Sequence, residues 1–285
     1  MSCTLPPEIL DLIVDCLHDK PATLETCCVV SKSWIPRARK HLFYNVEFRD
    51  SGRFSIKQWK EAFPDPSSSP AHHTRTLSIR AVPEVASVGG WLDGFHNVVR
   101  LRLECFGEEH HASLAPLYGL SPTLRSLTLV PTPIEVFEFI RSFPLLEDLA
   151  LGILDSGTEA DRWITPATSP KLTGTLHLRA AWEIRAAVRR LCALPGGVHF
   201  TKITLEFAIG DSESITDLVS MCSDNLEYLS VGRVGCLSPL GTFASATMIC
   251  QYLTTAHGCR GTWDIFPRPL HGHKTQSPGA SVGRD

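Results

Sequence analysis

Pairs of apolar residues separated by one position recur along most of the chain at nearly even intervals. The seven pairs are Leu77/Ile79, Leu101/Leu103, Leu127/Leu129, Leu149/Leu151, Leu176/Leu178, Ile203/Leu205 and Leu229/Val231. Their first members are 24, 26, 22, 27, 27 and 26 residues apart. No unit of this length folds alone, but short strands stacked with their return segments bury a continuous core. The pattern predicts an α/β chain in which seven strands form one curved parallel sheet.

The return segments show helical patterns that would close each coil behind its strand. Thr132 precedes Glu135 by three residues and forms a capping box, with Pro133 at the first helical position. One face of the helix that follows contains Ile134, Phe137 and Ile140. Weaker helical patterns cover residues 181–194 and 214–222. An ordinary α/β sheet of another topology also contains apolar pairs in buried strands, but the even spacing favours the repeat.

Residues 4–48 predict three short helices with more apolar surface than they can bury themselves. Pro6, Pro7 and Glu8 suit a helix start, and this helix extends to about His18. Its large apolar residues occupy more than one stripe and are Ile9, Leu10, Leu12, Ile13, Val14 and Leu17. A second helix covers residues 22–30, and a third begins near Pro36 and ends near residue 43. A module this small is close to the limit for a self-sufficient core, so we expect a partner to cover its second apolar face.

The same segment resembles the F-box family. The matching positions are Leu5-Pro6-x-Glu8-Ile9-Leu10, Ile13, Leu17, Leu24 and Val30-Ser31-Lys32-Ser33-Trp34. The resemblance implies that the segment binds a Skp-type adaptor, which joins a cullin scaffold in a ubiquitin ligase, while the rest of the chain selects a protein substrate. The residues implied for the adaptor interface, or for the core directly behind it, are Leu5, Pro6, Ile9, Leu10, Ile13, Leu24, Val30 and Trp34. The alternative is an N-terminal helical cap that packs on the repeats.

The repeats resemble the degenerate leucine-rich repeats that often follow an F-box, although no Asn or Cys of the usual consensus recurs at a regular position. Alternation along each strand turns the apolar pairs inward and their neighbours onto the concave surface. The outward set is Ser78, Arg80, Arg100, Arg102, Glu104, Thr128, His177, Arg179, Lys202, Thr204, Glu206 and Tyr228. Its early arginines suggest an acidic or phosphorylated substrate segment, because guanidinium groups match oxyanions. The competing interpretation is a solvated face without a ligand.

These patterns divide the chain into five parts. They are an F-box helical domain at 1–48, a connecting segment at 49–75, a leucine-rich-repeat-like solenoid at 76–235, a degenerate cap at 236–265 and a disordered tail at 266–285. The stretch 64–70 is rich in Pro and Ser and is predicted to be a loop or linker. Residues 250–253 are at best a degenerate strand.

Composition and charge exclude several classes of function. The formal net charge of −3 provides no positive field for nucleic acid or anionic membrane. The first eight residues lack the pattern of a signal peptide, and no apolar run is long enough to span a membrane. We therefore expect a soluble protein of the cytoplasm, the nucleus or both. The ten cysteines are predicted to be reduced core residues.

No residue cluster has the spacing of a catalytic or metal site. The nearest candidates are Glu108-Glu109-His110-His111, His72-His73 and His271-x-His273. A hydrolase with its site near Glu108, Glu109 and His111 would need an ordered pocket there. The sequence contains no recognised nucleophile, zinc or phosphate-binding motif. We predict that the protein is not an enzyme and uses no cofactor, and that it is either a substrate receptor of a ubiquitin ligase or a scaffold that binds protein partners without directing ubiquitin transfer.

Overall fold

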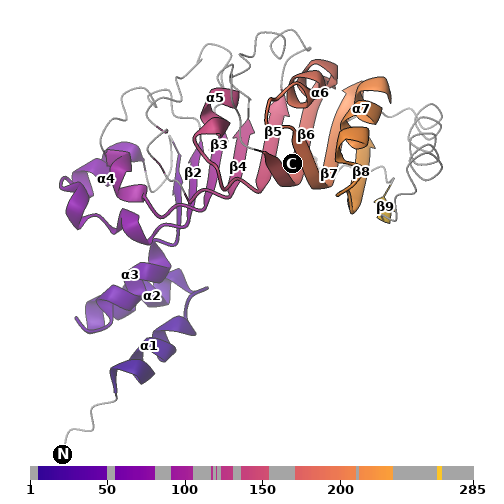
Figure 1. Cartoon of the computed structure of the whole chain (residues 1–285). Helices are drawn as coiled ribbons and strands as arrows, with labels where there is room; N and C mark the ends of the chain where they lie inside the picture. Colours follow the sequence, from indigo (N-terminus) through magenta and orange to yellow (C-terminus); the bar gives the residue numbers. More distant parts are fainter. Residues whose placement is uncertain are drawn as a thin grey trace, which may run out of the picture.

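The computed structural model describes residues 6–49, 55–80, 91–104, 117, 120, 123–130, 136–153, 171–209, 212–233 and 262–264. These residues form an α/β structure. Figure 1 shows the strands side by side in a row, with α5, α6 and α7 along one side, while α1 to α3 extend from the β1 end. The α-helices are α1 (Pro7–Asp15), α2 (Pro21–Val30), α3 (Ile35–Leu42), α4 (Ile56–Ala62), α5 (Val136–Arg141), α6 (Arg185–Cys192) and α7 (Ser212–Cys222). Three 3-10 helices are η1 (Pro66–Ser68), η2 (Pro70–His73) and η4 (Trp91–Phe95).

The described strands form one nine-stranded parallel sheet in which each strand pairs with the next along the chain. They are β1 (Asn45–Phe48), β2 (Thr76–Arg80), β3 (Arg100–Glu104), β4 (Ser126–Val130), β5 (Asp148–Ile153), β6 (Leu172–Glu183), β7 (Val198–Ile209), β8 (Tyr228–Arg233) and β9 (Thr262–Asp264). The predicted parallel sheet is therefore confirmed, and all seven apolar pairs lie on β2 to β8. Their first members align in one row across the sheet, and their second members align in another.

A repeated backbone contact joins the residues that lead into each early strand to the residue that leads into the strand before it. The carbonyl oxygens of Tyr44, Arg75, Val99 and Arg125 each accept hydrogen bonds from two successive N–H groups at the entry to the next strand. For example, Arg75 and Thr76 both donate to Tyr44, at 2.9 and 3.1 Å. This contact fixes the register before the strand begins, so the apolar rows stay aligned from coil to coil.

The sheet begins one strand earlier than the sequence predicted. The side chains of Val46 and Phe48 on β1 are buried in the same core as the later pairs, and β1 pairs with β2. Residues 45–48 thus lie in the sheet, although the predicted helical domain included them. A final strand, β9, pairs with β8 and was also missed, whereas the weak candidate at 250–253 lies outside the described residues.

The described part of the predicted connecting segment packs against the sheet and forms the return segment between β1 and β2. Helix α4 begins with a capping box, in which Ser55 Oγ accepts from Gln58 N and Ser55 N donates to Gln58 Oε1. Its Trp59 is buried, with ring centroids 5.5 Å from those of both Phe48 and Phe95. Further on, residues 69–71 are buried at η2. Free linkers do not bury aromatic cores, so this segment is part of the packed structure.

The observed helices differ from the predicted ones mainly at their ends. Helix α1 ends at Asp15 rather than near His18. Helix α6 begins at Arg185, because β6 continues to Glu183 through residues that were assigned to the helix. The predicted capping box at 132–135 lies outside the described residues, as do residues 266–285 and all of 236–265 except β9.

One glycine is required by the sheet. Gly174 has φ +76°, and a Cβ atom there would lie 2.2 Å from the carbonyl oxygen of Glu147. The same carbonyl accepts a 2.8 Å hydrogen bond from Thr175 N, at a register shift between β6 and β7. Any other residue would collide with backbone at this position, so the irregular start of β6 depends on glycine.

Candidate protein-binding surfaces

The helical region formed by α1, α2 and α3 has a small core, separate from the core of the sheet. Its buried apolar side chains are Val14, Leu24, Cys27 and Ala38. Four partly buried residues pack around them and are Leu17, Cys28, Trp34 and Leu42. Only one side chain of α1 is buried. Apolar packing alone therefore holds α1 weakly.

Large apolar side chains are exposed on the first two helices. In the described part of the chain, eight large hydrophobic residues are exposed, and five of them lie on α1 and α2. Ile9, Leu12 and Ile13 are 42%, 59% and 43% exposed and follow the spacing of one helix face. Val29 and Val30, at the end of α2, are 87% and 65% exposed. Exposed apolar residues concentrated in one small region mark an interaction site more often than scattered ones do.

The structure separates the predicted adaptor-binding residues into exposed and buried groups. Pro6, Ile9, Ile13 and Val30 are exposed, Leu10 and Trp34 are half-buried, Leu24 is buried in the small core, and Leu5 lies outside the described residues. The sequence analysis could not divide interface from core. It also left Leu12 and Val29 out of the predicted interface, although Leu12 follows Ile9 by three residues and so shares its helix face.

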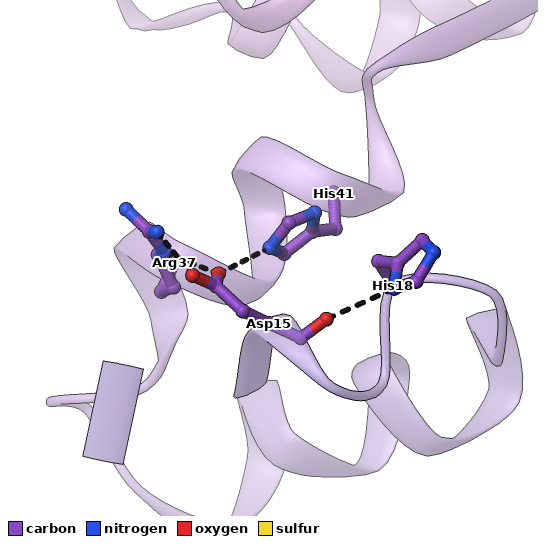
Figure 2. A network of polar contacts seen from close by, with 4 residues as sticks. All are labelled: Asp15, His18, Arg37 and His41. Atoms are coloured by element: carbon purple, nitrogen blue, oxygen red, sulfur yellow. Dashed lines mark hydrogen bonds and ion pairs between the residues drawn. The ribbon is translucent and has the colours of Figure 1, made fainter. Parts of the chain in front are cut away.

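A polar cluster attaches α1 to α3 (Figure 2). The carboxylate of Asp15 accepts a hydrogen bond from Arg37 Nε at 2.5 Å, and Arg37 Nη2 contacts its second oxygen. His41 Nε2 lies 2.7 Å from Asp15 Oδ1, and His18 Nδ1 lies 3.0 Å from the Asp15 carbonyl oxygen. The hydrogen bonds from Arg37 and then His41 hold the pKa of Asp15 well below its usual value. Asp15 is thus a carboxylate at neutral pH, and it compensates for the small apolar contact of α1.

The second candidate surface is the outward face of the sheet. Register pairing aligns Ser78, Arg102, Thr128, Ala150, His177, Thr204 and Ser230 across β2 to β8. A parallel row aligns Thr76, Arg100, Ser126, Asp148, Thr175, Lys202 and Tyr228. Arg100, Arg102, Arg179 and Lys202 are exposed, while Ser78, Arg80, Thr128, His177, Thr204 and Tyr228 are half-buried. The structure therefore brings the predicted substrate residues onto one face.

Carboxylates connect the arginines at the β1 end of this face. Arg80 Nε lies 2.6 Å from Glu47 Oε1 and 3.1 Å from Glu104 Oε2. Arg102 contacts the other oxygen of Glu104, and Arg49 Nη2 lies 2.7 Å from Glu47 Oε2. Hydrogen bonding from Arg49 and the charges of the arginines lower the pKa of Glu47, against the effect of burial. These ion pairs bring the guanidinium groups together, although Arg80 Nε and Glu47 Oε1 lie close without the geometry of a hydrogen bond.

This network was not predicted from the sequence. Glu47 and Arg49 were missed because β1 was not recognised as a strand. Glu104 was placed outward, and its side chain is only 8% exposed, because Arg80 and Arg102 both pair with it. At the far end of the face, His177 Nε2 and Arg179 Nε lie 3.8 and 3.9 Å from oxygens of Glu206, which is beyond hydrogen-bond length.

Of the nearest candidates for a catalytic or metal site, only His72 and His73 lie in the described structure. Glu108, Glu109, His110, His111, His271 and His273 lie outside it. His72 and His73 stack with ring centroids 3.9 Å apart, and burial, followed by the charges of His72, Lys40 and Arg39, lowers the pKa of His73. Within the described ranges, no group of three or more His, Cys, Asp or Glu side chains could hold a metal ion.

The described cysteines are free thiols in different environments. Cys27 and Cys222 are buried, as predicted for core residues, whereas Cys16 is exposed. Burial raises the pKa of Cys192 and of Cys222 to about 11, so both thiols are protonated at neutral pH. Separately, no helix in the described residues is long and apolar enough to cross a membrane.

Comparisons with known proteins give no family for this chain. No protein-family model matches it, and no curated protein shows significant sequence similarity to it.

Proposed function

We propose that this protein is a substrate-recognition adaptor of a Skp-cullin-F-box ubiquitin ligase, acting in ubiquitin-dependent protein degradation. The exposed apolar residues of α1 and α2 bind a Skp-type adaptor, which connects the chain to a cullin scaffold. The outward face of the sheet, whose strands are the leucine-rich-repeat-like part, binds the protein substrate. The chain itself performs no covalent step, since such ligases act by holding the substrate close to a charged ubiquitin-conjugating enzyme. It works in the cytoplasm, the nucleus or both.

One observation carries the proposal: the helical region exposes more large apolar side chains than it buries. Five are exposed on α1 and α2, against four buried apolar residues in the separate core. Complete burial of a large apolar side chain contributes about 1.5–3 kcal/mol before the costs of association, and Ile9, Leu12 and Ile13, which are 42–59% exposed, would each contribute about half of that. A protein partner that covers Ile9, Leu12 and Ile13 would therefore gain a substantial binding energy. The positions that resemble the F-box family support a Skp-type adaptor as this partner.

The polar cluster of Asp15, Arg37 and His41 supports the same assignment. An exposed apolar helix without such a cluster could turn its apolar face inward and collapse onto the small core. The two hydrogen-bonded contacts from α3 hold α1 in a single orientation and leave the apolar stripe outside. The binding face is thus preorganised, which reduces the entropy lost on association.

A scaffold that binds protein partners without directing ubiquitin transfer is the second candidate. The same helix face and the same sheet face would serve it, so geometry does not distinguish the two functions. Reconstituted ubiquitin transfer to a captured substrate does.

The first test is a pull-down of the full chain by a purified Skp-type adaptor, with the double variant Ile9→Asp/Ile13→Asp. Both side chains lie on the exposed stripe, so the variant should keep its fold while losing adaptor binding. The control is Leu145→Asp/Met221→Asp, which places charge at two equally exposed apolar positions of the sheet region, 46% and 42% exposed. We expect the control to bind like wild type. Equal binding by both variants, or no binding by wild type, contradicts the proposal.

A further inference from the structure

We infer that the outward face of the sheet binds an extended acidic segment that crosses the strands from β3 to β6. At the β1 end of this face, Arg49, Arg80 and Arg102 pair with two carboxylates, Glu47 and Glu104, and Arg100 is exposed on the same face of β3. The local charge is therefore +2, from four arginines and two glutamates, on a chain whose formal net charge is −3. This excess of positive charge attracts anionic ligands.

The two glutamates orient the arginines without using all their hydrogen-bond donors. Arg80 Nε lies 2.6 and 3.1 Å from the two carboxylates, and the Arg80 side chain remains 36% exposed. Arg100 is exposed, and no carboxylate among the described residues pairs with it. Arg100 and Arg102 lie two residues apart on the same face of β3, which suits two neighbouring oxyanions. This is a fixed group of donors with capacity left for a ligand.

The row of outward positions between Arg102 and His177 is low and carries no charge, whereas the neighbouring row holds the exposed carboxylate of Asp148 on β5, so a peptide would cross along the Arg102 row. On β4 and β5 the outward positions beside Arg102 and His177 hold Thr128 and Ala150. The next outward position on β5 is Gly152, against which the side chain of Val130 packs. Gly152 itself is buried beneath Val130, so it is the small side chains of Thr128 and Ala150 that let an extended chain lie close to the sheet.

A second cationic group lies on the far side of this low section. Arg179 on β6 and Lys202 on β7 are exposed cations beside His177, and the carboxylate of Glu206 lies 3.8 Å from His177 Nε2 and 3.9 Å from Arg179 Nε. From β3 to β6 there are three strand spacings, or about 14 Å, which an extended peptide covers in about four residues. The geometry thus fits a segment with two acidic groups about four residues apart.

The occupant is a peptide, and its oxyanions can be carboxylates or phosphates. An acidic peptide is thus the class of substrate for the proposed function. Only the fate of the bound segment, its ubiquitination, rests on that function. Binding itself is independent of α1 and α2.

The test uses the purified full chain and the fluorescence anisotropy of labelled Gly/Ser peptides. One peptide carries two Glu-Glu pairs about four residues apart, a second carries phosphoserines at those positions, and a third carries glutamines. We expect both acidic peptides to bind, the glutamine peptide not to bind, and added salt to weaken binding. Preference between the two acidic peptides identifies the natural oxyanion. No binding by any peptide, or equal binding by the glutamine peptide, overturns the inference.

Two variants locate the binding. Arg100→Gln/Arg102→Gln should raise the Kd for the acidic peptide about tenfold, while Lys171→Gln/Arg189→Gln, which removes the same charge from exposed positions elsewhere, should leave it nearly unchanged. Ala150→Trp should block the crossing without changing any charge. The location is refuted if Arg100→Gln/Arg102→Gln and Lys171→Gln/Arg189→Gln change the Kd equally. It is also refuted if Ala150→Trp binds the acidic peptide like wild type. All variants should still bind the Skp-type adaptor, so a failure here is distinct from a failure of the proposed function.

Discussion

The helical region and the sheet region of this protein bury their apolar residues to very different degrees. On β2 to β7, both members of every inward pair are buried, and aromatic and aliphatic residues of the return segments complete one continuous core. In the helical region only four apolar side chains are buried, and more large ones are exposed on α1 and α2. The sheet is thus self-sufficient by stacking, while the helices depend on one polar cluster and leave an apolar face for another molecule.

The same contrast applies to polar contacts. In the helical region, Asp15 connects α1 to α3 and compensates for scarce apolar packing. On the sheet, the network of Glu47, Arg80 and Glu104 lies on the outward face, above a core that is already complete. Glu104 is nearly buried in this network, while the Arg102 side chain is 52% exposed and accessible to a ligand. The two regions therefore use charge for different purposes.

The largest effect should come from Phe48→Ala in the sheet. Phe48 is fully buried and contacts the Trp59 and Phe95 rings, so its removal leaves a cavity and should lower the free energy of unfolding by about 3–5 kcal/mol. Urea denaturation measures this change. Tyr44→Ala, at an exposed aromatic side chain nearby, should cost less than about 1 kcal/mol. A small effect of Phe48→Ala would mean that β1 is not integral to the core.

A smaller and local effect is expected from Leu24→Ala in the helical region. Leu24 is one of the four buried residues there, and we expect a loss of about 2–3 kcal/mol that is confined to this region. Hydrogen exchange should then increase in α1 to α3 and stay unchanged in β2 to β8. Val30→Ala, at an exposed position, should change neither. If the sheet amides lose protection together with the helices, the two regions unfold as one unit and the comparison fails.

The sequence predicted the sheet well because its signal is local. Each strand of β2 to β8 places two apolar residues at positions i and i+2, and the interval between strands is nearly constant. Strand β1 was not predicted because Val46 lies 31 residues before Leu77, and the longer segment between them contains α4. Strand β9 was not predicted for the same reason, since Trp263 lies 34 residues after Leu229. A period search finds regular repeats and misses those with longer coils.

The candidate sites were predicted less completely, because they depend on tertiary contacts. The apolar residues of α1 are alike in sequence, and the packing of Val14 onto α2 and α3, together with the contacts of Asp15 to α3, decides that Ile9, Leu12 and Ile13 stay exposed. The partners of Asp15 lie 22 and 26 residues away, a separation that no local pattern encodes. On the sheet, the outward arginines were correctly placed by alternation. Their pairing with Glu47 required β1, which the sequence analysis had assigned to the helical domain.

The smallest effect is expected from Asp15→Asn, which tests whether charge holds α1. The variant loses the charge-assisted bonds from Arg37 and His41, and we expect α1 to lose about 1 kcal/mol of protection at neutral pH. Hydrogen exchange of a peptide spanning α1, corrected for intrinsic exchange rates, measures this loss. Asp19→Asn, at an exposed acid just after α1, is the matched control and should leave protection unchanged.

The pH dependence of α1 gives an independent measure of the same interaction. Because the pKa of Asp15 is lower in the folded protein than its usual 3.8, its contribution is complete above that value and is lost as pH falls through the folded pKa. Wild-type α1 should therefore lose protection as pH decreases below about 4, and the Asn variant should show a flatter profile. Matching profiles would show that Val14 packing alone holds α1. In that case the orientation of Ile9 and Ile13, and with it the preorganised adaptor face, would have to come from the bound partner.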